Sequence, residues 1–458
     1  MPAARLHVAP AEALRDGLDA LRAEAGVPTA FAPDVEAEAV VAAAREPEGE
    51  RSELPFVTID PPGSKDLDQA VHIERLGDGH RVHYAIADVA AWVTPGGAID
   101  REAHARGVTV YAADERTPLH PPVLSEGGAS LLPGQWCPAI LWTLDLDAVG
   151  ELVATHVARR LVRSRAQHTY ADVPEALEPL LREVGERRLA LQRARGGVEL
   201  DVPEQEVVQE EGGWTTRFRV SLASEEFNAQ VSLLTGIAAA RLMLEAGTGI
   251  LRTQPRPDAK AIDRLRRQAT ALGAPWPEQQ PYAEYIASLD ASIGAQAVLL
   301  REATGVGRGA GYTAFDGTSP PPEERTHFAL ATEYAHATAP LRRLQDRYVS
   351  ECCLAACAGA PVPSWVLEAL PGLPATMAAT TRRANAVVRG AVDLAEALLR
   401  SGRVGERFDG LVVDDDLVQL AEPAVRARLQ GAPAPGTPVT VRLEAADPAT
   451  RKVTFTLA

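Results

Sequence analysis

The stretch at residues 56–71, FVTIDPPGSKDLDQAV, constrains the fold and the chemistry of this chain more than any other. Its apolar, β-branched start predicts a strand that ends at Asp60, and a Pro-Pro-Gly turn then leads to Asp66 and Asp68. Such a turn brings the two later carboxylates back beside the end of the strand. Neighbouring carboxylates repel each other unless a cation offsets their charge, and Mg²⁺ prefers oxygen ligands. The pattern predicts a metal site, although a solvated acidic turn has the same composition.

Four further segments follow this stretch in a specific order. They are VHYAIADV, the tyrosine-containing VTVYAADERTPLHPPVLSEGGASLLPG, NAQVSLLTGIAAARLM and YAHATAPLRRLQDRY. Together with the aspartate stretch they resemble the catalytic domain of the RNase II (RNB) family of exoribonucleases. The resemblance implies a Mg²⁺-dependent hydrolase that releases nucleoside 5′-monophosphates one at a time from the 3′ end of single-stranded RNA, without sequence preference.

The resemblance also assigns the metal ligands. Asp60, Asp66 and Asp68 match the family's metal-binding aspartates, and Asp68 is expected to be essential for catalysis. Gln69 stands where the family has a fourth aspartate, and we expect it to act as a weaker ligand because an amide oxygen carries no charge. Asp88 either approaches this cluster or, in the interpretation that we favour, is a structural carboxylate that caps the next turn.

The expected RNA contacts come from two other segments. Arg342 matches the catalytic arginine that holds a phosphate through two hydrogen bonds, and Tyr111 matches the aromatic residue that stacks on the last base. Arg343, His336 and Thr338 lie close to Arg342 in the sequence and are expected to contact RNA as well. The less favoured alternatives are a surface ion pair on a helix for Arg342 and a place in the core for Tyr111.

The order of strand and helix patterns predicts an α+β fold with a central sheet wrapped by helices. Residues 70–75 and 81–88 alternate around a Gly-Asp-Gly turn and predict a β-hairpin. Longer helices are predicted at residues 224–246, with Ser224 as the N-cap, and at residues 340–358.

We expect three parts in the chain. Residues 1–50 form a small helical element, which either covers the catalytic domain or contacts nucleic acid as a helix-turn-helix-like unit. Its few basic residues favour the first role. Residues 51–400 form the RNB-like catalytic domain, and residues 401–458 resemble an OB-fold RNA-binding barrel of the ribosomal-protein type. That barrel has few aromatic residues, so a mainly structural role is the alternative.

Composition limits the partners. A net charge of -16 argues against a protein that coats nucleic acid, although clustered arginines still permit a basic channel. The four cysteines form no disulfide framework, and no signal peptide or apolar stretch of about 18 residues is evident. We therefore expect a cytoplasmic monomer that uses no nucleotide cofactor and contacts no membrane.

Three classes of function fit parts of this pattern. An RNA exonuclease accounts for the aspartates, Arg342, Tyr111 and the barrel together. A catalytically weak RNA-binding member of the same fold is the main alternative, but it would be expected to lose the aspartates. A Mg²⁺-dependent phosphatase would need the aspartates but neither the barrel nor the stacking tyrosine.

Overall fold

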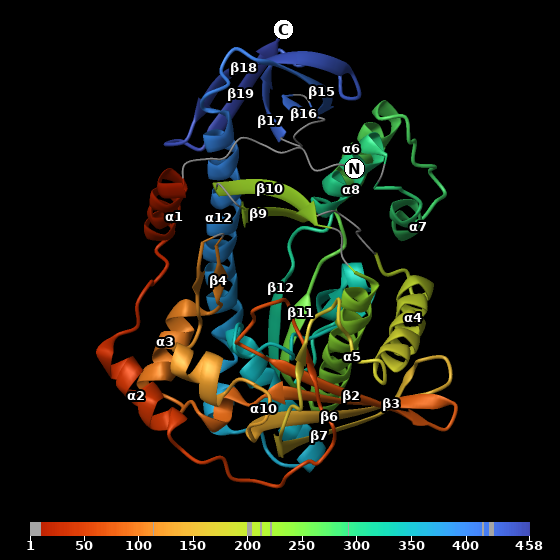
Figure 1. The fold of residues 1–458 in the computed structure, drawn as a ribbon. Coiled ribbons are helices and arrows are strands. Elements are labelled where there is room, and N and C mark those ends of the chain that lie inside the picture. The colour runs from red at the N-terminus through yellow and green to blue at the C-terminus, as the bar shows by residue number, and fades with distance from the viewer. Residues whose placement is uncertain are drawn as a thin grey trace.

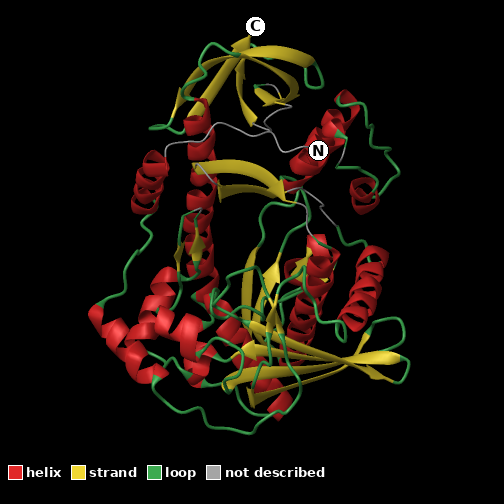
Figure 2. Cartoon of the chain, viewed as in Figure 1, coloured by secondary structure: helices red, strands yellow, loops and turns green. Residues whose placement is uncertain are grey.

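The computed structural model of the chain describes residues 11–112, 114–198, 204–210, 213–219, 222–291, 293–414, 416–420 and 426–458. Figure 1 shows a sheet surrounded by helices at one end, a small β-barrel at the other, and a long helix, α12, between them. Figure 2 shows that helices and strands are mixed around the sheet, whereas the described part of the barrel consists of strands. This architecture confirms the predicted α+β class.

The central sheet has four antiparallel strands in the order β2-β3-β6-β7. Their bounds are β2 Gln69–Leu76, β3 Gly79–Ala87, β6 Cys137–Leu146 and β7 Leu152–Val162. The first two form the predicted hairpin, with Gln69 opposite Ile86 and Leu76 opposite Gly79. Beside the sheet, the short strand β1 (Thr58–Ile59) pairs in parallel with β8 (Gln167–His168), so Asp60 follows directly at the end of a strand, as expected.

Three helices cover the sheet: α4 (Glu178–Ala194), α5 (Ala223–Ala246) and α10 (Leu344–Ala358). The core that they share with the sheet includes Trp142, Leu234 and Val349, each essentially inaccessible to solvent. Among the described residues, α5 is the one helix long and apolar enough to cross a membrane, but 67% of its apolar window is buried inside the protein. A helix in the middle of a core has this composition for a different reason, since neighbouring elements cover it on several sides.

Two helix starts differ from the prediction. The N-cap of α5 is Leu222, and Ser224 instead donates its hydroxyl to the backbone carbonyl of Tyr170 at 2.5 Å. Helix α10 begins at Leu344 rather than at residue 340, because the preceding residues form an irregular loop that hydrogen-bonds to other parts of the chain. That loop contains Arg342.

Other elements lie around the sheet or between it and the barrel (Figure 1). They are α2 Pro33–Ala43, α3 Ala98–Arg106, β4 Val110–Tyr111, β5 Arg116–Thr117, β9 Glu204–Glu210, β10 Gly213–Arg219, β11 Thr248–Thr253, α6 Ala259–Ala271, α7 Tyr282–Ala287, α8 Gly294–Thr304, β12 Gly311–Asp316, α9 Pro322–Arg325, β13 Thr326–His327, β14 Thr332–Glu333, α11 Ser364–Ala369 and α12 Leu373–Arg400. The helices α6 to α8 are inserted between the paired strands β11 and β12. Their apolar cluster includes Leu265, Leu299 and Val413 of the barrel, so the insertion packs against the C-terminal domain.

The C-terminal barrel is closed, with the strand order β15-β16-β17-β19-β18. Its strands are β15 Arg407–Asp414, β16 Leu417–Leu420, β17 Arg426–Gln430, β18 Pro438–Asp447 and β19 Lys452–Leu457. Phe408 and Phe455 meet edge to face, with ring centroids 5.8 Å apart, in its core. Both aromatic residues of this segment are therefore buried, so neither offers its ring to a base on the barrel surface.

The N-terminal helix α1 (Ala11–Glu24) packs along α12 through Leu14, Leu18 and Leu21. Arg22 follows on the same helix with only 2% of its surface exposed, and it donates to both carboxylate oxygens of Asp114 at 2.8 Å. Asp114 lies in the turn between β4 and β5. The predicted covering element thus anchors the hairpin that carries Tyr111.

Replacing Arg22 with Met keeps most of the side-chain length but removes the guanidinium partner of Asp114. Breaking a buried ion pair of this kind costs about 3–5 kcal/mol, so we expect faster amide exchange in residues 11–24 and 110–117. Hydrogen–deuterium exchange with mass spectrometry measures this change. Arg15→Met, on the exposed side of the same helix, is the matched control, and equal protection in the two variants would contradict this role for Arg22.

Candidate active site

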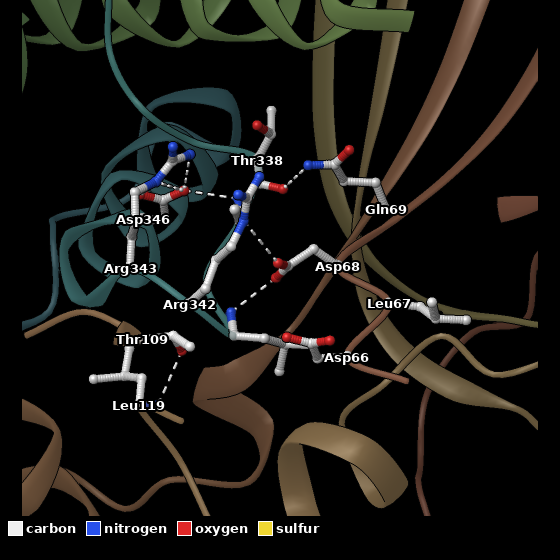
Figure 3. Close-up of polar contacts among 12 residues, drawn as sticks. Asp66, Leu67, Asp68, Gln69, Thr109, Leu119, Thr338, Arg342, Arg343 and Asp346 are labelled. Carbon is white, nitrogen blue, oxygen red and sulfur yellow. Dashed lines mark hydrogen bonds and ion pairs between the residues drawn. The ribbon is translucent and has the colours of Figure 1, made fainter. Parts of the chain in front are cut away.

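Three segments that are distant in the sequence meet at one end of the sheet. They are the turn between β1 and β2, the β4–β5 hairpin, and the loop at residues 334–343 that precedes α10. The loop is bonded to both of the others: Leu341 bonds to Asp68, and Thr109, just before β4, donates its backbone N–H to the carbonyl of Arg342 at 3.0 Å. Figure 3 is a close-up of the polar contacts at this junction.

Asp68 is the most enclosed of the three predicted aspartate ligands, with 5% of its surface exposed. Its Oδ1 accepts a hydrogen bond from the backbone N–H of Leu341 at 2.8 Å, and its Oδ2 lies 3.6 Å from Nε of Arg342 (Figure 3). Burial raises the pKa of Asp68 to about 8, because the nearby Arg342 and the Leu341 amide only partly compensate for lost hydration. The predicted catalytic pair is therefore brought together.

Asp60 ends β1 and is also held away from water. Its Oδ2 is buried and has no hydrogen-bond partner among the described residues. Burial is the main cause that raises the pKa of Asp60 to about 6, and the charge of Asp66 adds to the shift. A buried carboxylate oxygen without a donor is costly, and a cation would satisfy it. The donor set and this unpaired oxygen both fit a hard divalent cation.

Asp66 points toward the hairpin instead. Arg116 donates a very short hydrogen bond to its Oδ1, and the hydroxyl of Tyr111 lies 3.4 Å from its Oδ2. Arg116 also contacts Glu126 at 2.7 Å. Within the described ranges, no three acidic, histidine or cysteine side chains are arranged closely enough to hold a metal ion as they stand. Asp66 is instead paired with Arg116, and Asp68 with the backbone amide of Leu341.

Gln69 has a different set of contacts from those of the expected metal ligand. Its amide nitrogen donates to the backbone carbonyl of Thr338 at 2.6 Å, and its amide oxygen accepts from the hydroxyl of Tyr84 at 2.7 Å. A carbonyl can only accept, so Thr338 fixes which end of the amide faces the loop. The Tyr84 hydroxyl lies 2.9 Å from that of Ser232 on α5. Gln69 thus ties two strands and a helix to the loop, and the proposed ligand set consists of the three aspartates without it.

The other expected RNA contacts are engaged within the loop. Arg343 donates to Asp346, with NH2 to Oδ2 at 2.8 Å, and Asp346 is fully buried. His336 lies 2.8 Å from the hydroxyl of Tyr312, and burial with nearby arginines keeps its pKa well below the usual value, so the ring is neutral. Thr338 is 4% exposed and contributes its carbonyl to Gln69. These three residues shape the loop, whereas the side chain of Arg342 is 46% exposed.

Two residues with open alternatives are now placed. Tyr111 is 45% exposed, so its ring is not part of the core. Asp88 accepts a hydrogen bond from Arg159 at 2.8 Å, which is a structural contact, but in the described part of the chain its side chain makes no hydrogen bond that caps the next turn, Val89–Ala91. Sequence reasoning missed Arg116. A single arginine in a turn-rich segment has no periodic signal, and its contact with Asp66 spans 50 positions.

Comparison with known proteins agrees with this geometry. The RNB domain model matches residues 50–357, and the model of the RNase II-type exonuclease C-terminal S1 domain matches residues 406–458. Ribonuclease R of Escherichia coli (strain K12) is 30% identical over an alignment of 324 residues, and the match covers 64% of this chain and 38% of that protein. Ribonuclease R of Aquifex aeolicus (strain VF5) is 29% identical over an alignment of 389 residues, and the match covers 79% of this chain and 54% of that protein. The chain thus spans about half or less of the length of these relatives.

Solved structures show the same fold. A structure of Mycoplasma genitalium RNase R in complex with ribose-methylated single-stranded RNA superposes with a TM-score of 0.86 at 18% identity, covering 98% of this chain and 78% of that one. Yeast Ssd1, described as a pseudonuclease, superposes with a TM-score of 0.69 at 15% identity, covering 93% of this chain and 57% of that one. Since the RNB model alone matches more than half of the residues, the protein belongs to the RNB family.

Proposed function

We propose that the protein is a Mg²⁺-dependent exoribonuclease that hydrolyses single-stranded RNA from the 3′ end and releases nucleoside 5′-monophosphates. The observation that carries this proposal is the junction of Asp68 and Arg342. It sets a buried carboxylate and a half-exposed guanidinium 3.6 Å apart at the end of a sheet. The RNA in the M. genitalium RNase R complex supports single-stranded RNA as the ligand class.

The proposed ligands are Asp60, Asp66 and Asp68. When bound, a divalent cation supplies Lewis acidity and positive charge at the scissile phosphate. Arg342 lies next to Asp68 and keeps its guanidinium accessible, so it can donate two hydrogen bonds to a phosphate in the transition state. Tyr111 is 45% exposed at the edge of the same site, with its hydroxyl 3.4 Å from Asp66, and its ring can stack there on the last base whatever that base is.

A catalytically weak RNA-binding protein of this fold is the second candidate. Ssd1 shows that the fold by itself does not guarantee nuclease activity. Retention of all three aspartates and of Arg342 beside them favours the nuclease, since binding alone does not require buried carboxylates next to a phosphate. RNA labelled at either end, incubated with and without Mg²⁺, separates the two: a nuclease shortens 5′-labelled RNA progressively and releases labelled mononucleotide from 3′-labelled RNA.

Asp68→Asn should lower the rate of RNA hydrolysis by more than about 100-fold, the order of loss when a group that acts in the transition state is removed. The dissociation constant for RNA should stay within about twofold, because the arginines and the tyrosine are intact. Single-turnover assays and filter binding measure the two quantities. Asp78→Asn, at the exposed turn of the β2–β3 hairpin that follows Asp68, is the matched control, and a similar rate in both variants would remove Asp68 from the mechanism.

Tyr111→Ala should release longer end products and weaken binding of short RNA by roughly 5- to 150-fold, since one stacked base contributes about 1–3 kcal/mol. Tyr111→Phe keeps the ring but loses the hydroxyl near Asp66, so its end products should resemble those of the parent protein. Denaturing gels of a poly(A) digest show the product lengths. If Ala and Phe at this position give the same end products, the ring does not hold the last base.

The raised pKa values of Asp60 and Asp68 link stability to pH. In the metal-free protein, the folded state retains protons that the unfolded chain releases above a pH of about 4. Stability should therefore fall as the pH rises from about 4 to about 8, by up to roughly 1.4 kcal/mol per pH unit for Asp68. Metal affinity should rise over the same range, because the ligands must ionise.

Thermal unfolding in EDTA from pH 5 to 9 measures this linkage. The melting temperature of Asp68→Asn minus that of the parent protein should increase up to pH 8 and then level off. A difference that stays constant with pH would show that Asp68 is ionised throughout this range in the folded protein.

A further inference from the structure

Arg116 is the basic residue in closest contact with the proposed metal ligands. From strand β5 it extends one guanidinium nitrogen to Oδ1 of Asp66 and another to Oε1 of Glu126, the latter at 2.7 Å. Its side chain is 26% exposed and that of Asp66 only 14%. The contact with Asp66 is therefore partly shielded from water, which strengthens it relative to a surface ion pair.

This contact and a cation make competing demands on Asp66. One of its carboxylate oxygens is occupied by Arg116, and the other faces the hydroxyl of Tyr111. An arginine stays protonated at all physiological pH values, so it repels any cation that approaches the same carboxylate. When all three aspartates are ionised, as metal binding requires, the two nearby arginines, Arg116 and Arg342, leave one net negative charge for attracting a divalent ion. The neutral side chain at Gln69 does not add to that charge.

Glu126 gives the guanidinium another carboxylate partner. It belongs to the short helical segment Leu124–Gly128, and its side chain is 23% exposed. Because Arg116 already contacts Glu126, it can release Asp66 without becoming an unpaired charge. We propose that Arg116 is an internal counter-ion that competes with the divalent cation for Asp66, and that Glu126 retains its guanidinium when the cation binds. The inference rests on the proposed function only in taking Asp66 as a metal ligand.

Two consequences of opposite sign follow. Without metal, Arg116 offsets repulsion among the aspartates, so its removal should lower the stability of the metal-free protein. With metal, the same removal should tighten cation binding, because a positive charge close to the ion is lost. A residue that merely supported the fold would change both quantities in the unfavourable direction. The pair of measurements thus distinguishes competition from support.

The test is a titration of the RNA-free protein with Mn²⁺ as the probe cation, followed by calorimetry or by the electron paramagnetic resonance signal of free Mn²⁺. Arg116→Gln should bind Mn²⁺ roughly tenfold more tightly than the parent protein, and its melting temperature in EDTA should be lower. Arg75→Gln is the control, since Arg75 forms an ion pair with Glu183 on the exposed part of the β2–β3 hairpin. That variant should bind Mn²⁺ as the parent does.

Glu126→Gln tests the second half of the proposal. With its alternative partner weakened, Arg116 should hold Asp66 more firmly, and Mn²⁺ affinity should fall. In the double variant with Arg116→Gln, the effect of Glu126→Gln should shrink, since the coupling passes through the guanidinium. If Arg116→Gln fails to fold, Arg116→Lys provides the measurement, because lysine keeps the charge but cannot span both carboxylates as a fork. The effect of Glu126→Gln on Mn²⁺ affinity should then be smaller in Arg116→Lys than in the parent protein.

Unchanged or weaker Mn²⁺ binding in folded Arg116→Gln would overturn the inference, as would failure of both proteins to bind Mn²⁺. The proposed function fails separately. Tighter Mn²⁺ binding in the variant without any RNA hydrolysis by the parent protein would support the counter-ion and refute the nuclease. Hydrolysis of RNA by the parent protein, with equal Mn²⁺ affinity in the parent and in Arg116→Gln, would support the nuclease and refute the counter-ion.

Discussion

The hydrogen bond from the Leu341 amide to Asp68 joins two segments that are 273 positions apart in the sequence. It couples the start of β2 to the loop before α10, and the rest of the site depends on that coupling. Arg342 follows Leu341 directly, so the bond that orients the carboxylate also fixes the distance to the arginine. Gln69, the first residue of β2, adds a second bond to Thr338 in the same loop. Two adjacent residues, one at the end of the turn and one at the start of the strand, thus hold two points of one loop.

In the metal-free protein, the buried carboxylates of the site are electrostatically unfavourable. Asp60 has an unpaired buried oxygen, and both Asp60 and Asp68 have raised pKa values because water is excluded from them. Arginines relieve part of this cost at Asp66 and Asp68. A site of this kind is not optimised for the stability of the metal-free protein, since the carboxylates would be better solvated on the surface. Under the proposed function, an incoming cation would satisfy the unpaired oxygen of Asp60, and a phosphate would meet the accessible guanidinium of Arg342.

The parts of the structure that could be predicted from the sequence are those that depend on local patterns or on the family resemblance. The β2–β3 hairpin follows from alternation around a Gly-containing turn, and Asp68 and Arg342 were paired because both matched the family. Ser224 was misassigned as a cap because a serine near the start of a helix is usually one, whereas here it bonds to Tyr170, 54 positions away. The contacts of Gln69 and Arg116 depend on tertiary packing, for which the residues near them in the sequence give no signal.

The hairpin that carries Tyr111 and Arg116 is too short to hold its own position. Its two strands have two residues each, and a hairpin of that length is not stable alone. Arg22 of α1 holds its turn through Asp114, while Glu24 on the same helix bonds to Arg451 of the barrel at 2.7 Å. The same helix therefore contacts both the hairpin beside the aspartates and the domain at the other end of α12. The N-terminal helix, although it lies outside the matched catalytic domain, thus supports the turn of the hairpin from which Arg116 contacts Asp66.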